Sequence, residues 1–399
     1  MQQKYDFILF ENYTDAIHHY KDILIIAKML KHAGYSVAII NYCEESLYCN
    51  NDELTFLDFK NKYKRPNTEW NKQPRNKIHS LFSLLRFLYQ QHKYASYFLK
   101  QNKGLAKNFY LGSYHLSMSS VFFTKSLANC NYYLWGLRSS RITNIKRKFL
   151  RNPIIGLKAL QLRKLFKSKN NFNFFVSDNF IKQEFIDLGI SKNKLVLRPE
   201  RIIENQLSGN IQLLSEDFSL LTIGLMREDK RVELTIESIK QLNDNFNDVY
   251  LTIAGRGNEK YEKIIEKYID NNKNIVRIDK FLDNDEFNSL IERSHFVVLC
   301  DKRQSSLITN GTMLESFILN RPIIAPNYLP YSYYINEYKI GLLFDPDDIE
   351  SLKSQIIKAK QLGTKSFLPN LKEFQKTLLM DISTNKFVED LKWSMNKKL

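Results

Sequence analysis

Six short apolar runs, separated by segments with helical spacing, constrain the fold of this chain more than any other feature. They are FSLLTIGL, DVYLTIAGRG, NIVRIDKF, HFVVLC, RPIIAP and IGLLFD, all between residues 217 and 345. A continuous apolar run is typical of a strand buried on both faces, and strands that alternate with helices form parallel sheets. We therefore predict a parallel α/β unit over this part of the chain.

The N-terminal half repeats the pattern. DFILF and SVAIINY are apolar runs on either side of a segment with helical spacing, and Gly34 lies where that helix would end. KNFYLGSYH, NYYLWGL and NFFVS continue the series. A chain of 399 residues is longer than one ordinary domain, and residues 205–217 have the polar composition of a linker. We predict two α/β domains joined there.

The positive charge lies in the N-terminal half. The formal net charge is +16, and residues 1–200 hold 32 Lys and Arg against 14 Asp and Glu. Between Glu69 and Asp178 there are 20 Lys and Arg and no carboxylate. Segment 141–169 mixes ten of these cations with apolar residues, as in an amphipathic helix at a membrane surface. We expect an anionic membrane surface or a phosphate-linked acceptor as partner, and not nucleic acid, because no nucleic-acid-binding module is recognisable.

Other features exclude several classes of protein. No apolar run reaches the roughly 18 residues that a membrane span needs. The first strand begins without a signal-peptide pattern, so we expect a cytoplasmic protein. The four cysteines form no CxxC pair and have no histidine at ligand spacing, which favours buried free thiols over a disulfide or a zinc site.

Residues 305–326, SSLITNGTMLESFILNRPIIAP, place a turn before a helix. Asn310, Gly311 and Thr312 form the turn, and Glu315 lies one helical turn further on. A glycine at a helix N-terminus lets phosphate oxygens approach backbone N–H groups, and the helix dipole favours an anion.

A second phosphate-binding pattern precedes it. Gly224 ends a strand, and Arg227 and Lys230 lie just before a helix. Two cations at the carboxyl edge of a parallel sheet can clamp a pyrophosphate, so we take these three residues as candidates for that role.

Taken in order, these segments resemble a known family. Gly-x-x-Arg-x-x-Lys at 224–230, LTIAGRG, HFVVLC, TNGTMLESFILNRPIIAP and IGLLFDPDD are similar to the C-terminal domain of GT-B glycosyltransferases, family 4 and its relatives, the glycosyl transferases group 1. The resemblance covers about residues 217–360, and the N-terminal half more loosely. It implies an α/β fold of two Rossmann-like domains facing a cleft. Residues 1–205 would bind the acceptor and 206–375 the nucleotide sugar, and a helix at 376–399 would cross back to the N-terminal domain.

The resemblance also implies roles for individual residues. Lys230, with Arg227 beside it, would contact the diphosphate of a nucleotide sugar, which we expect to be UDP- or GDP-linked. The backbone amides of Gly311 and Thr312 would bind the same phosphates, and Glu315 would accept hydrogen bonds from the ribose. We expect no metal or other cofactor, because Lys230 and the helix N-terminus would neutralise the departing diphosphate.

The sequence departs from the family pattern at two places. Family 4 members usually carry two glutamates separated by seven residues, and the first position is Leu307 here. Thr309 or Asn310 is our candidate for contacting the sugar instead. The family arginine directly after the glycine is replaced by Leu225, and Arg227 is the candidate substitute. Retaining or inverting stereochemistry therefore stays open.

A general base would come from the N-terminal half. The segment KNFYLGSYHLSMSSVFFTKSL resembles the family segment that carries a histidine, here His115. The other candidates are two histidines of the carboxylate-free region and the titratable residues of the loop after the first strand: His79, His92, Glu11, Asp15, His18 and His19. An inverting enzyme would need one of these groups to deprotonate the acceptor hydroxyl, and we favour Asp15, then His18. Helix capping by the aspartate, or a partly buried histidine, is the alternative for each.

These observations predict a hexosyltransferase-type enzyme of cell-surface polysaccharide biosynthesis, bound peripherally to the inner face of the cell membrane. Its acceptor would be a glycan or a polyprenyl-pyrophosphate-linked glycan. Two other interpretations stay open. A non-catalytic GT-B partner subunit is favoured by Leu307. A nucleotide-sugar epimerase of the same fold would turn over its substrate without an acceptor.

Overall fold

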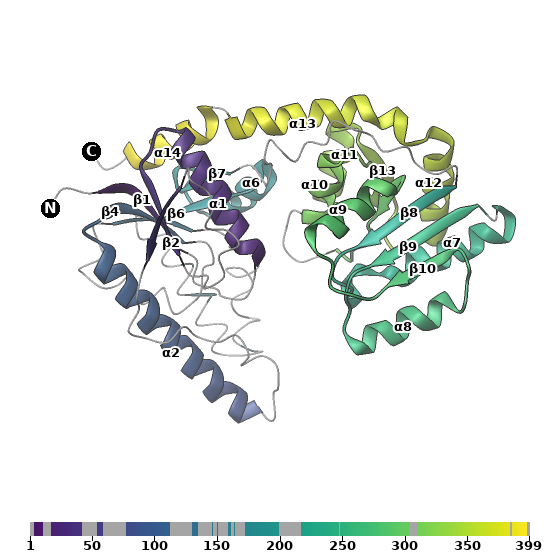
Figure 1. The fold of residues 1–399 in the computed structure, drawn as a ribbon, viewed down its shortest axis with the longest axis horizontal. Coiled ribbons are helices and arrows are strands. Elements are labelled where there is room, and N and C mark those ends of the chain that lie inside the picture. The colour runs from purple at the N-terminus through teal and green to yellow at the C-terminus, as the bar shows by residue number, and fades with distance from the viewer. Residues whose placement is uncertain are drawn as a thin grey trace. The chain divides into compact units, whose positions relative to one another are not determined.

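The computed structural model describes residues 4–10, 17–41, 54–58, 77–111, 130–134, 172–198, 217–246, 248–303, 310–383 and 385–396, with the single positions 146, 150, 159, 160 and 163. The chain divides into two compact units. The first comprises Met1–Arg201 with Asp381–Leu399, and the second Ile202–Met380. Figure 1 shows the elements of each unit. The boundaries predicted from the sequence are after residues 205 and 375.

The first unit is built on a parallel sheet. Its described strands are β1 (Tyr5–Phe10), β2 (Val37–Asn41), β3 (Thr55–Asp58), β4 (Ala106–Leu111), β5 (Asn131–Leu134), β6 (Phe172–Val176) and β7 (Leu195–Leu197). They pair in the order β3-β2-β1-β4-β5-β6-β7, and every pair is parallel. All residues of β5 and β6 are buried, which explains why both strands are apolar except for Asn131 and Asn173.

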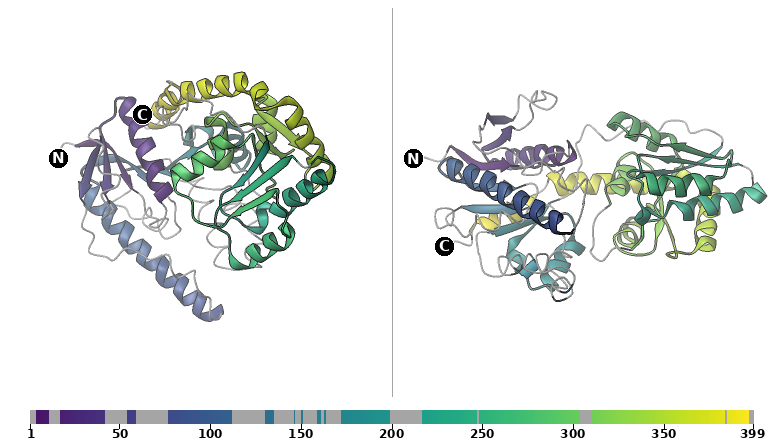
Figure 2. Two further views of the ribbon diagram at one scale, coloured as in Figure 1. Left: turned by 45° about the vertical axis from the view of Figure 1, so that its right-hand side comes forward. Right: turned by 90° about the horizontal axis from the view of Figure 1, so that it is seen from below.

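Helices of the first unit follow the expected alternation. They are α1 (Ile17–His32), α2 (Lys77–Asn102), α6 (Asn179–Asp187), the short helix η5 (Lys192–Lys194) and α14 (Asn385–Asn396). α1 and α6 are each followed by a left-handed glycine, Gly34 at φ 87° and Gly189 at φ 81°, a conformation that a side chain would disfavour. The long α2 extends well beyond the sheet in Figure 1 and in the left view of Figure 2.

The last helix of the chain, α14, packs into the first unit. Phe387 and Leu391 are buried in one apolar cluster with residues of β1, α1 and β6. The ring of Phe387 lies 5.7 Å from that of Phe175 in β6. Lys182 of α6 donates to Asp390 at 2.7 Å. Residues far apart in sequence therefore build a single core.

The second unit holds a second parallel sheet. Its described strands are β8 (Phe218–Ile223), β9 (Val249–Ala254), β10 (Ile275–Ile278), β11 (Phe296–Val298), β12 (Ile323–Pro326) and β13 (Gly341–Phe344), in the order β10-β9-β8-β11-β12-β13. Every pair is parallel. The direction in which strands are added reverses between β8 and β11, and open sheets of this kind bind ligands at the carboxyl edge of such a switch point.

Helices alternate with these strands. They are η7 (Glu228–Lys230), α7 (Val232–Phe246), α8 (Glu259–Ile269), α9 (Asn284–Arg293), α10 (Gly311–Ile318), α11 (Tyr331–Tyr338), α12 (Ile349–Leu362), η8 (Thr364–Phe367) and α13 (Leu368–Ser383). Asp283 caps α9 in a reciprocal capping box with Glu286. The sequence did not predict α11.

Two units with parallel sheets and helical connections confirm the predicted α/β class with two Rossmann-like domains. Among the helices that the structure describes, none combines the length and the apolar character that crossing a membrane requires.

Candidate donor site

Two glycines bring the ends of β8 and β9 into close contact. Gly224 follows β8 at φ 117°, and Gly255 follows β9 at φ 120°. A Cβ atom on Gly255 would lie 2.0 Å from the backbone oxygen of Gly224, so only glycine fits there. Met226 donates its N–H to the oxygen of Arg256 at 3.0 Å. The β8–α7 loop is therefore fixed against the end of β9.

Helix α10 begins against the same loop. A Cβ atom on Gly224 would lie 3.6 Å from the Thr312 hydroxyl oxygen, so the first turn of α10 borders this glycine. Asn310 is the N-cap, and its side-chain oxygen accepts from Met313 N–H at 3.2 Å. Within the described part of the chain, the N–H groups of Gly311 and Thr312 have no acceptor. Unpaired amides at a helix N-terminus are suited to binding an anion.

Lys230 reaches the switch point from η7. Its ammonium group lies 2.9 Å from Asp301 Oδ1, and the two side chains are 16% and 11% exposed. Asp301 follows β11, whereas Lys230 follows β8. The ion pair therefore joins the two strands between which the order of the sheet reverses.

Asp301 is a residue that sequence reasoning missed. Its Oδ2 accepts from Asn310 Nδ2 at 2.6 Å and from the hydroxyl of Tyr331, and its backbone oxygen accepts from the hydroxyl of Tyr328. Burial and the Asp301 carboxylate raise the pKa of Tyr331 and of Tyr328, so both phenols stay protonated as donors. The only sequence signal was a carboxylate directly after a buried strand.

Arg227, predicted to assist Lys230, also has a carboxylate partner. Its guanidinium donates two hydrogen bonds to Asp229, each of 3.0 Å, and its side chain is half exposed. Arg256 and Arg303 follow β9 and β11 and are exposed, without an ion-pair partner among the described residues. Both predicted phosphate-binding cations are thus paired, and further cations lie on neighbouring strands of the same edge.

Arg231, directly after Lys230, adopts a left-handed conformation with φ 50°. Its guanidinium binds Glu233 at 2.9 Å and also Asp347, itself left-handed at φ 65°. Tyr261 links Glu233 of α7 to α8 by a hydrogen bond of 2.8 Å. These contacts hold a backbone conformation that is costly for a non-glycine residue immediately beside Lys230.

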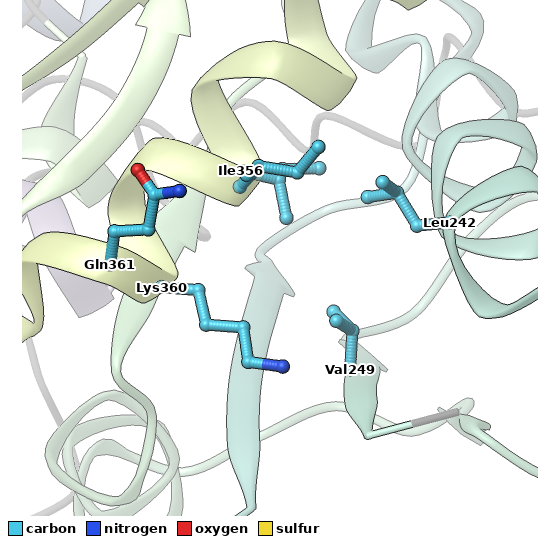
Figure 3. Close-up of a pocket in the computed structure, with 6 residues that line it drawn as sticks. Leu242, Val249, Ile356, Lys360 and Gln361 are labelled. Atoms are coloured by element: carbon cyan, nitrogen blue, oxygen red, sulfur yellow. The ribbon is translucent and has the colours of Figure 1, made fainter. Parts of the chain in front are cut away.

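A separate pocket lies at the opposite edge of this sheet. It has a volume of about 330 Å³ and is lined by α7, α12 and the first residue of β9 (Figure 3): Leu242, Val249, Ile356, Ile357, Lys360 and Gln361. Because it adjoins the amino end of β9, this pocket is distinct from the site described above.

The sequence of the second unit matches a family model. Residues 205–372 correspond to the model described as Glycosyl transferases group 1. This part of the chain is therefore a group 1 glycosyltransferase domain. A search of curated proteins found no match to its sequence.

Solved structures share the fold of this chain over nearly its whole length. A glycosyltransferase from Rickettsia africae has 14% identity and a TM-score of 0.63, with 99% of this chain and 97% of that chain covered. WaaG, a glycosyltransferase involved in lipopolysaccharide biosynthesis, has 12% identity and a TM-score of 0.64, with 98% of each chain covered. At identities this low, the structural similarity establishes a shared GT-B fold alone.

A third similar structure is larger. A mutant of TarM from S. aureus, in complex with fondaparinux, alpha-GlcNAc-glycerol and UDP, has 15% identity and a TM-score of 0.57. The alignment covers 77% of this chain and 59% of TarM.

Most of the predicted donor-binding residues lie together at one edge of the group 1 domain. Glu315 lies one turn inside α10 and is partly buried. Asn310, a candidate for contacting the sugar, uses its side chain to cap α10 and to hold Asp301, and its contact with the sugar stays a prediction. Thr309 and Leu307 lie outside the described residues.

The predicted catalytic residues belong to the first unit. Asp15 and His115 lie outside the described residues, and His18 lies in the first turn of α1 with a side chain that is not described. Most of the basic segment 141–169 also lies outside them. In the described part of the chain, no group of three or more His, Cys, Asp or Glu could hold a metal ion. Cys130 and Cys300 are buried and free, as predicted, and burial raises the pKa of Cys300 to about 12.

Proposed function

We propose that this group 1 glycosyltransferase moves one sugar from a nucleotide-sugar donor onto a glycan or a lipid-linked acceptor in cell-surface polysaccharide biosynthesis. One observation carries the donor assignment. The unpaired amides at the start of α10 border Gly224, and Lys230 reaches the same switch point from the loop after β8. A diphosphate at this edge would receive backbone N–H groups and an ammonium group.

The chemistry of transfer follows from these groups. The bond between the sugar and the diphosphate breaks as the acceptor hydroxyl attacks the sugar, and negative charge grows on the departing diphosphate. Fixed N–H groups and Lys230 would stabilise that charge as it develops. We propose that the reaction needs no metal ion, since this neutralisation is already available in the protein. Asp15, then His18 or His115, would take the proton of the acceptor.

The acceptor and the location are proposed from charge and similarity. The carboxylate-free region between Glu69 and Asp178 would attract a pyrophosphate-linked acceptor and the anionic inner face of the membrane. WaaG acts in lipopolysaccharide biosynthesis, and the TarM structure contains UDP and a sugar-glycerol. Both support a nucleotide-sugar donor and a surface-glycan acceptor here.

The test is a transfer assay with the full-length protein. UDP-, GDP-, CDP- and dTDP-linked sugars, each labelled in the sugar, are incubated with and without a membrane extract. The proposal predicts that label from one donor enters the lipid or polysaccharide fraction only when the extract is present. Conversion to another nucleotide sugar without extract would indicate an epimerase. Neither release nor transfer from any donor would indicate a non-catalytic partner subunit.

A further inference from the structure

The ion pair between Lys230 and Asp301 raises a question about the donor site. A carboxylate in a site for a diphosphate opposes the ligand by charge, yet this one lies 2.9 Å from the lysine that would bind the phosphates. The two side chains are only 16% and 11% exposed, so salt screens their interaction poorly. Asp301 therefore either weakens donor binding or prepares Lys230 for it.

The other contacts of Asp301 favour preparation. Its two carboxylate oxygens are divided between different partners: Oδ1 faces Lys230, and Oδ2 receives Asn310 Nδ2 at 2.6 Å and the hydroxyl of Tyr331. Tyr328 holds the backbone of Asp301 through its oxygen. A carboxylate fixed by α10, by α11 and by its own backbone has one defined orientation. Its other oxygen, Oδ1, then defines where the ammonium group of Lys230 lies.

Holding the Lys230 side chain in place before the donor binds would increase the affinity for the donor. Its side chain has four flexible carbons and loses substantial rotamer entropy when it is immobilised. If Asp301 already immobilises it, the donor does not have to do so on binding, and affinity rises. An ammonium group has three hydrogens, so Lys230 keeps donors for phosphate oxygens while it is bound to Asp301.

We propose that Asp301 is a positioning residue of the donor site, which acts through Lys230 by holding its ammonium group at the switch point. Asn310 and Tyr331 fix Asp301, and Asp301 fixes Lys230. The inference rests on the proposed function, because it presupposes that Lys230 contacts the diphosphate of the donor. It makes Asp301 a residue whose carboxylate strengthens the binding of an anion.

The test is a double-mutant cycle on nucleotide affinity in the full-length protein. UDP, GDP, CDP and dTDP are titrated by calorimetry, and the tightest is used for the variants. Asp301→Ala is expected to weaken binding about tenfold, because Lys230 becomes mobile. Asp301→Asn keeps an oxygen that can accept from Lys230, and a loss of less than about threefold is expected. In a Lys230→Met background, Asp301→Ala should change the dissociation constant less than about twofold.

Two further variants separate this role from a loss of folding. Tyr331→Phe removes one hydrogen bond to Asp301 and leaves the carboxylate, so a loss of about two- to fivefold is expected, again absent in the Lys230→Met background. Asp248→Ala breaks another Lys–Asp pair of the same unit, with Lys360, and should leave binding unchanged. Melting temperatures identify any variant that does not fold, and Tyr331→Phe then carries the test.

Two outcomes overturn the proposal while leaving the donor site intact. Equal or tighter nucleotide binding by Asp301→Ala would mean that the carboxylate only repels the ligand. The same loss in the Lys230→Met background would mean that Asp301 acts independently of the lysine. If the wild-type protein binds none of the four nucleotides, the proposed function fails and the role of Asp301 fails with it.

Discussion

At the scale of single residues, charges cancel in pairs at the carboxyl edge of the second sheet, where the candidate donor site lies. This edge is called the donor edge below. Arg227 is bound by Asp229, and Lys230 by Asp301. The positive charge that remains at this edge therefore comes from residues outside the phosphate-binding motif, among them the exposed Arg256. Because salt screens exposed charges much more than buried pairs, we expect nucleotide binding to weaken as ionic strength rises.

Substitution of Leu225 by a cation tests whether positive charge at this edge strengthens nucleotide binding. It occupies the position of the family arginine directly after Gly224, and it is 57% exposed, so a longer side chain can be accommodated without disturbing the core. Leu225→Arg is expected to tighten nucleotide binding by about three- to tenfold, because it adds a cation beside the diphosphate. Leu362→Arg adds the same charge on an exposed position at the end of α12 and should have no effect. Titration calorimetry measures both, and equal responses would contradict the assignment of this edge.

Glu315 tests the orientation of the nucleotide. If its carboxylate accepts hydrogen bonds from the ribose, the wild-type protein should prefer a ribonucleoside diphosphate over its 2′-deoxy form by about tenfold. Glu315→Ala should lose most of that preference. The measurement compares dissociation constants of UDP and dUDP, or of the matching pair for another base, in both proteins. A preference that survives the substitution would place the ribose elsewhere.

At the scale of elements, the donor edge depends on the contact between the ends of β8 and β9. Gly255→Ala would place a Cβ atom 2.0 Å from the oxygen of Gly224 in a backbone of φ 120°. We expect a loss of about 2–4 kcal/mol in the free energy of unfolding of the second unit, from steric overlap and backbone strain. Gly311→Ala, in the same unit, where an added Cβ atom meets nothing within 4 Å, is the control. Urea unfolding measures both, and similar midpoints for the two variants would show that this contact is unimportant.

The elements themselves could be predicted from the sequence, because each depends on local pattern. Apolar runs between helical segments predicted the strands, and α9 begins directly after Asp283, a residue type that commonly caps a helix. Helix α11 was missed because YSYYINEY has weak helical amphipathicity, and its position depends on packing of Tyr334 and Ile335. The sequence could also have predicted that Asn310 is an N-cap, because an asparagine before a helix commonly has that role.

At the scale of the whole molecule, the sequence predicted the fold class and the family but not the network at the site. Asp301 meets Lys230, Asn310 and Tyr331 only because the sheet order places the ends of β8 and β11 side by side. Contacts across such a switch point are absent from any local pattern. A sequence motif contains the residues that would contact a ligand, but it does not contain the residues, such as Asp301, that position those contact residues.

The stability of the second unit should depend on pH through His295. Its Nδ1 accepts from the N–H of Ser219 at 3.1 Å, which requires the neutral ring. Burial, and to a lesser extent Arg321, lowers its pKa below the ordinary 6.5. The unfolded chain therefore binds a proton near pH 6.5 that the folded chain still excludes. The contribution of His295 to the free energy of unfolding is fully present above this pH and is lost as the pH falls below it.

Urea unfolding between pH 7.5 and 5 measures this dependence. His295→Asn keeps an oxygen that can accept from Ser219 and removes the titration, so its stability should depend less on pH over this interval. Identical pH dependence in the two proteins would exclude His295 as the source.

The central claim is that Lys230 and the first turn of α10 bind a nucleoside diphosphate. The most direct measurement is the melting temperature of the full-length protein with UDP, GDP, CDP or dTDP, for the wild type, Lys230→Met and the control Lys353→Met. A ligand that binds only the folded state raises the melting temperature by mass action. We predict that at least one nucleotide stabilises the wild type and Lys353→Met, and stabilises Lys230→Met much less. Stabilisation by none of the four, or equal stabilisation of Lys230→Met, would contradict the claim.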